Sequence, residues 1–174
     1  LEAIPDPAAD EALRDALGKV QGRLLVGVIN SLAVRRDAKA TDALIARLKD
    51  PDAEVASAAA EALGRIGGDQ ATGALVPMLA TAPPPVRPYV AYGCILCAER
   101  LLAEGKAEPA TKLYDTVAKA DVPQQRRLEA IRGAILARGA AGVPILVEQL
   151  QSKDKALFTI GLRWTSATRG VLIL

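Results

Sequence analysis

The chain has 174 residues and a formal net charge of +2, with 51% apolar but only 3% aromatic residues. This balance provides no global field that would favour nucleic acid or a membrane surface as a partner. The apolar segments are interrupted by charges and stay below the ~20 residues that a bilayer crossing needs, so we expect a soluble chain without membrane insertion. Alanine and leucine dominate the apolar residues, which is typical of closely packed helices.

Apolar side chains recur every three or four residues along most of the chain, which predicts a succession of amphipathic helices. The first begins at Asp6-Pro7, an N-cap followed by a proline at the first helical position. Asp50-Pro51-Asp52 forms a turn and an N-cap, and Gly67-Gly68 provides a left-handed C-terminal stop. The predicted helices span roughly residues 7–20, 23–36, 40–50, 53–66, 70–80, 86–104, 106–119, 124–138, 142–150 and 155–169.

The chain repeats itself. Residues 40–50 (ATDALIARLKD) match residues 71–81 (ATGALVPMLAT) at an offset of 31, and the same offset places Leu32 on Leu63. Agreement of separate stretches on one period indicates a repeat. About ten helices would then form about five antiparallel pairs, stacked as an all-α solenoid in a single domain over residues 1–174.

The third predicted helix pair departs from this period. Pro77 lies inside its first helix and predicts a kink, because proline removes one backbone hydrogen bond. The loop that follows contains residues 83–85, three prolines in a row. Irregular loops are common places for specific contacts, which draws attention to Arg87, Tyr89 and Tyr92 beside this loop.

Residues 50–68, with the sequence DPDAEVASAAAEALGRIGG, together with residues 74–76 resemble the HEAT-repeat family, and within it the bacterial subclass named after phycobilisome-lyase HEAT-like repeats. The resemblance is specific over residues 22–79 and fair over residues 128–150. Ala56 departs from it, since the family usually has arginine there. The resemblance implies a right-handed superhelix of the armadillo type that binds partners and carries no common catalytic residues.

The first residue and the family resemblance both suggest that this chain is part of a larger protein. Because residue 1 is leucine, we expect the chain to be a processed form or one module of a larger protein. Its repeats are similar to HEAT segments of large multidomain bacterial proteins, which are often exported. The sequence leaves the localisation open.

The second helix of each predicted pair carries most of the positive charge. Thirteen basic and five acidic side chains there leave +8, so the rest of the chain sums to −6. Since second helices tend to the concave side, one interpretation is a basic concave groove. The other is that arginines near helix C-termini complement the helix dipole and cap loops. The candidate partner-binding residues of the concave face and its rim are Arg36, Arg65, Arg87, Tyr89, Tyr92, Arg127, Arg132 and Arg163.

No catalytic centre, metal site, cofactor or small-molecule substrate is indicated. The chain has no histidine, so a Ser–His or Cys–His pair cannot be assembled. Cys94 and Cys97 have the spacing of a redox or metal pair, but a zinc site needs four ligands and a redox cysteine lies at a helix N-terminus. Both cysteines fall on an apolar stripe, where we expect buried thiols. We expect Phe158 and Trp164 to cover the terminal core.

These observations predict a non-enzymatic scaffold that binds a protein partner on the concave face. The first alternative is nucleic acid or another polyanion in the basic groove, as in some HEAT-like bacterial DNA glycosylases. Those enzymes use tryptophans and an aspartate in the groove, which a lone Trp164 near the end does not supply, and sparse aromatics disfavour stacking on single strands. A second alternative, an accessory subunit of a chromophore lyase, rests on the subclass name.

Overall fold

The computed structural model describes residues 6–151, and within that range the chain folds into helices without a strand. The all-α prediction is therefore confirmed for these residues, whereas the predicted helix at 155–169, with Arg163 and Trp164, lies outside them. The helices are α1 (Pro7–Ala16), α2 (Gly22–Arg35), α3 (Thr41–Arg47), α4 (Ala53–Ile66), α5 (Asp69–Thr81), α6 (Arg87–Ala103), α7 (Ala107–Lys119), α8 (Gln124–Arg138) and α9 (Val143–Leu150), with short 3-10 helices η1 (Ala38–Ala40) and η2 (Gly139–Gly142).

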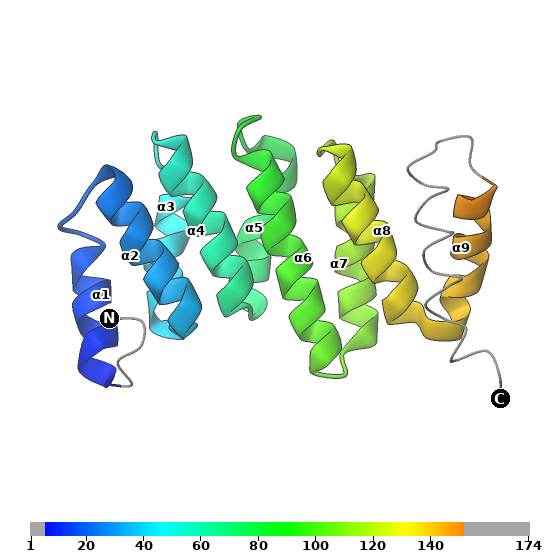
Figure 1. The fold of residues 1–174 in the computed structure, drawn as a ribbon, viewed down its shortest axis with the longest axis horizontal. Helices are drawn as coiled ribbons and strands as arrows, with labels where there is room; N and C mark the ends of the chain where they lie inside the picture. The colour runs from blue at the N-terminus through cyan, green and yellow to red at the C-terminus, as the bar shows by residue number, and fades with distance from the viewer. Residues whose placement is uncertain (1–5, 152–174) are drawn as a thin grey trace.

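The helices form two layers. Figure 1 shows α2, α4, α6 and α8 side by side toward the viewer, with α3, α5 and α7 behind them. Each front helix packs against the helix that precedes it in the chain and against the next front helix. We call the outward side of α2, α4, α6 and α8 the front face. A stack in which each pair contacts its neighbours is the arrangement that the sequence repeat predicts.

The predicted helix caps are present. The Asp6 carboxylate accepts a hydrogen bond from the backbone N–H of Ala8 at 2.8 Å, and Asp52 accepts one from Glu54 at 2.9 Å. Each bond satisfies one of the backbone donors that have no partner inside the helix. Gly67 ends α4 with a φ of 73°, a conformation that favours glycine. The acidic turn residues are thus accounted for as structural caps.

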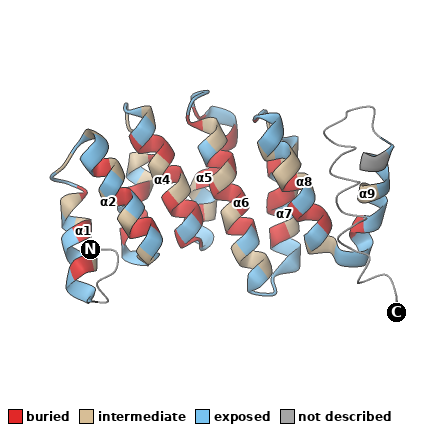
Figure 2. Ribbon diagram, viewed as in Figure 1, coloured by how far each residue is buried: buried red, intermediate tan, exposed pale blue. Residues whose placement is uncertain are grey.

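Buried side chains lie between the two layers, as the red segments of Figure 2 show. Leu32, Leu63 and Leu75 are fully buried there and come from α2, α4 and α5. Helix α5 continues through Pro77 to Thr81, so this proline does not end the helix. Pro77 is exposed, where water can satisfy the carbonyl that loses its backbone partner.

Helices α4 and α6 touch through their backbones. A Cβ added to Gly64 would lie 2.6 Å from the Cα of Gly93, and one added to Gly93 would lie 2.5 Å from the Ala60 carbonyl oxygen. Real side chains do not approach so closely, so glycine is required on both sides of this contact. The short distance fixes how α4 and α6 sit in the front layer.

One stretch, Gln124–Glu148, is long and apolar enough by length and composition to cross a membrane. In the structure it is divided among α8, η2 and α9, with Gly139 in the left-handed region between the helices. The core helices of soluble proteins pass the same test, so the stretch is weak evidence for a membrane span.

Candidate partner-binding face

Several arginines of the front helices bind other parts of the chain. The Arg100 guanidinium donates to the Ile66 carbonyl at the end of α4, and Arg35 donates to the Asp10 carboxylate of α1. The hydrogen bond between Arg35 and Asp10 lowers the pKa of the Asp10 carboxyl and raises the pKa of Arg35. Arg138 donates to a carboxylate of α7 at 2.6 Å. Arg100 thereby caps the end of α4, whereas Arg35 and Arg138 form ion pairs that join neighbouring helices.

Arg87, a predicted partner-binding residue, also serves the fold. Its guanidinium donates to the Ala82 carbonyl at 3.1 Å and to the Asp121 carboxylate at 3.0 Å. These bonds connect the loop before α6 with the loop after α7. Arg87 would have to leave both partners before it could bind another protein.

Arg65 and Tyr92 each contact another side chain. The partner of Arg65 lies one turn earlier in α4, and the partner of Tyr92 lies in α8. Arg65 donates to Glu61 at 2.8 and 3.1 Å, and this hydrogen bond raises the pKa of Arg65. The Arg126 guanidinium lies 4.4 Å from the ring centroid of Tyr92, within cation–π range. Tyr92 is half-buried beneath it, whereas Tyr89 is 42% exposed. Of the two tyrosines, Tyr89 is therefore the more accessible.

The predicted residues divide between two edges of the front face. The front helices run in the same direction, so their C-terminal ends share one edge, with Arg36 and Arg65, and their N-terminal ends share the opposite edge, with Tyr89 and Arg127. An α-helix of 14 residues is ~21 Å long, which separates the edges. Arg132 lies between them on α8. The structure therefore spreads these residues over the face and does not gather them in one strip.

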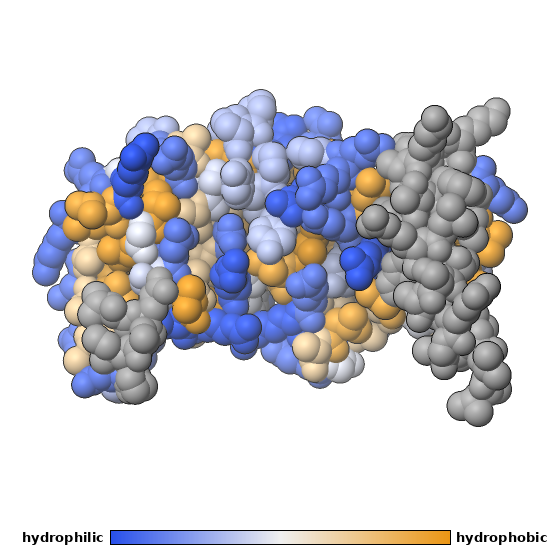
Figure 3. Space-filling model, in the orientation of Figure 1, coloured by the Kyte–Doolittle hydropathy of each residue, from blue (hydrophilic) through white to orange (hydrophobic). Residues whose placement is uncertain are grey.

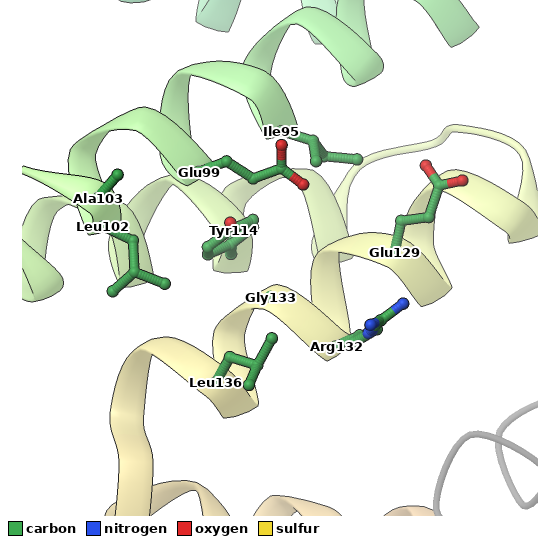
Figure 4. A pocket seen from close by; sticks show the side chains of 9 residues that line it. All are labelled: Ile95, Glu99, Leu102, Ala103, Tyr114, Glu129, Arg132, Gly133 and Leu136. Carbon is green, nitrogen blue, oxygen red and sulfur yellow. The ribbon is translucent and has the colours of Figure 1, made fainter. Parts of the chain in front are cut away.

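Two grooves open on the front face, and the first lies between α6 and α8. It encloses about 440 Å³, with Leu102 and Leu136 at one end and Glu99, Glu129 and Arg132 at the other (Figure 4). Figure 3 shows the apolar end as an orange area between the lower ends of the two helices. Apolar and charged groups at opposite ends suit an amphipathic partner surface.

Tyr114 of α7 forms the bottom of the α6–α8 groove. A Cβ added to Gly133 would lie 2.3 Å from the Tyr114 ring, so the missing side chain of Gly133 makes room for that ring. Tyr114 is 2% exposed, and burial, reinforced by the nearby Glu99 carboxylate, raises its pKa to about 12. The shift does not change the state of the hydroxyl at neutral pH, since an ordinary tyrosine is also protonated there.

The second groove lies among α2, α4 and the start of α6 and encloses about 470 Å³. Val26 and Asn30 come from α2, Glu54 and Glu61 from α4, and Tyr89 from α6. No lysine or arginine lines it. Glu54 and Glu61 were not among the predicted binding residues, because a charge total does not show where each side chain lies. Their seven-residue spacing, which keeps them on one helix face, was the available signal.

Cys94 and Cys97 are buried, as the apolar stripe predicts. Burial raises the pKa of both thiols, and the Cys97 thiol donates to the Gly64 carbonyl at 3.9 Å. In the range 6–151, no three His, Cys, Asp or Glu side chains gather where they could hold a metal ion. The two cysteines thus act as small core residues.

Thiol labelling tests this assignment. Because the thiolate is the reactive form and both groups are buried, we expect a thiol reagent at pH 8 to modify native protein about 100-fold more slowly than protein unfolded in urea. The reaction is followed by absorbance with and without denaturant. Rapid modification of either cysteine in the native state would contradict its place in the core.

Comparison with known proteins bears on the first half of the chain. Residues 10–93 match the family model of HEAT repeats. This range covers α2 to α5 with parts of α1 and α6 and includes the contact between Gly64 and Gly93. No curated protein matches the chain. The match supports a HEAT-repeat family, whose members commonly act as scaffolds for protein interactions and are generally non-catalytic.

Proposed function

We propose that the chain is a non-enzymatic scaffold that binds a protein partner on its front face. The observation that supports this most strongly is that both grooves open on that one face. Each groove is built from neighbouring helix pairs, so it exists only in the stacked array. HEAT repeats commonly bind proteins, which agrees with this role.

We also propose that the array of helices is curved, with the front face on the inside. Neighbouring front helices contact each other more closely than neighbouring back helices do, and a layer with closer spacing lies on the inside of a curve. The front face would then be the concave side of a right-handed superhelix. Helices α1 to α8 would form four of about five pairs, and α9 would begin the next, as in the phycobilisome-lyase HEAT-like subclass.

The partner would contact the exposed members of the predicted set first. Arg132 and Tyr89 each line one of the two grooves, and Arg127 is exposed at the start of α8. Aromatic and arginine side chains often dominate binding energy at protein interfaces. Arg36, Arg65, Tyr92, Arg87 and Arg163 complete the proposed surface.

Charge reversal on the two faces tests the proposal. Immobilised wild-type protein is compared with the front-face double variant Arg127→Glu/Arg132→Glu and the back-layer double variant Lys112→Glu/Lys119→Glu. Both variants change the net charge by the same amount, so a general charge effect cancels. We expect partner retention to fall about tenfold in the front-face variant alone. Equal retention by all three proteins would reject the front face as the binding surface.

Nucleic acid is the less favoured partner, because acids line the grooves and several arginines are bound within the fold. Titration with duplex DNA at about 50 mM salt separates the two alternatives, since phosphate binding weakens steeply as salt rises. Absence of binding at low salt would remove the nucleic-acid alternative. No residue on this face favours the role in a chromophore lyase.

A further inference from the structure

Small side chains line the groove among α2, α4 and α6. Ala53, Ser57 and Ala58 come from α4, and Pro85 and Tyr89 come from the start of α6 and the loop before it. Because the three side chains from α4 are short, the space beside them is wide enough for the side chains of a bound segment. The proline and the tyrosine ring add rigid groups to the lining.

Ser57 gives the groove a hydrogen-bonding group that a bound segment can use. It is 7% exposed, and its hydroxyl lines the groove without a hydrogen-bond partner among residues 6–151. A buried hydroxyl without a partner is unfavourable. A bound group that exchanges a hydrogen bond with Ser57 would remove this cost.

The charge of the side chains that line the groove indicates which kind of group would bind there. Glu61 already pairs with Arg65 at the groove edge. Glu54 is exposed and has no ionic partner in the part of the chain that the structure describes. With no basic side chain in the lining, the groove complements a cation. The exposed ring of Tyr89 can contact the same cation or its aliphatic stem.

The spacing of the two carboxylates is compatible with an extended partner segment. Glu54 and Glu61 are seven residues apart on one helix face, which is ~10.5 Å along the axis. A polyproline II segment has three residues per turn and rises ~3.1 Å per residue, so its side chains i and i+3 lie on one side ~9.3 Å apart. Two basic residues at that spacing match the two carboxylates.

We infer that this groove binds an extended segment of the protein partner that carries two lysine or arginine residues three positions apart. One cation pairs with Glu54, the other approaches Oε2 of Glu61, since Arg65 holds Oε1, and Ser57 bonds a polar group of the segment between them. The inference rests on the proposed function, because it names the partner chemistry for one part of the front face.

Nuclear magnetic resonance titration tests the inference with the peptide GKPPKG, whose prolines favour the polyproline II conformation. We expect shifts of the backbone amide signals of Glu54, Ser57 and Tyr89. The variant Glu54→Gln should weaken binding about fivefold, the size expected for one exposed charge pair. The matched control Glu11→Gln, an exposed glutamate on α1, should leave the Kd unchanged.

Three results would overturn the inference: no shifts at these amides up to millimolar peptide, equal Kd values for wild type and Glu54→Gln, or equal binding of GEPPEG. None of them concerns the retention of the protein partner by the two charge-reversal variants. If the peptide fails while the Arg127→Glu/Arg132→Glu variant loses the partner, the inference is wrong and the proposed function stands. If the peptide binds as expected while that variant keeps its partner, the inference holds and the proposed binding residues of α8 are wrong.

Discussion

Replacing Gly93 with alanine is expected to lower the free energy of unfolding by about 3 kcal/mol. The added Cβ would lie 2.5 Å from the Ala60 carbonyl oxygen, which is backbone and cannot rotate away. Helices α4 and α6 would have to separate, and the buried side chains between them would lose contacts. This cost exceeds the gain of up to ~1 kcal/mol that alanine brings over glycine inside a helix.

The matched control is Gly73→Ala in α5, where an added Cβ meets nothing within 4 Å. Since Gly73 is exposed inside a helix, alanine should raise the free energy of unfolding by up to ~1 kcal/mol. Urea unfolding followed by circular dichroism measures both variants against wild type. If Gly93→Ala were as stable as Gly73→Ala, the close contact between α4 and α6 would be wrong.

Replacing Leu63 with alanine is expected to cost about 3 to 5 kcal/mol. Leu63 is fully buried in the C-terminal half of α4 and belongs to the hydrophobic core. Truncation removes its contacts and leaves a cavity that the surrounding helices can fill only in part. Such a loss is a large fraction of the stability of an ordinary domain, so the midpoint of urea unfolding should fall clearly.

The control for this variant is Leu24→Ala in α2. Leu24 is 72% exposed and lies near the start of α2. We expect a change within about 0.5 kcal/mol, because truncation there leaves no cavity. A large loss at Leu24 together with a small loss at Leu63 would contradict the burial of Leu63 and the exposure of Leu24.

The helix positions could be predicted from the sequence because local signals agree with one another. The interval 53–66 between Asp52 and Gly67 was predicted and is observed as α4, since the cap, the apolar stripe and the glycine stop all lie within the same segment. The burial of Cys94 and Cys97 was predicted for the same reason. Both are confirmed in the structure.

The roles of the arginines could not be predicted in this way. Arg100 and Ile66 are 34 residues apart, and Arg87 and Asp121 are also 34 residues apart. Whether an arginine binds a carbonyl of a neighbouring pair or faces solvent depends on distances between helices that no local pattern contains. Position near a helix C-terminus favoured capping, and that signal was correct for Arg138, which donates to the Ala134 carbonyl of its own helix, whereas Arg35 bonds to α1 instead.

The grooves were not predicted either, because they depend on helix spacing. Gly64 and Gly93 bring α4 and α6 into backbone contact, whereas Tyr114 and Gly133 shape the space between α6 and α8. In the sequence, Gly64 belongs to the repeat motif and Gly133 carries no signal. The binding surface thus follows from contacts between repeats more than from the repeat itself.

The most direct test of the central claim, that the front face binds the partner, is hydrogen–deuterium exchange of the chain with and without the protein that it retains. We predict slower exchange in α4, α6 and α8 on binding, with the back helices α3, α5 and α7 unchanged. Slowing confined to those back helices, with no change along the front layer, would contradict the claim.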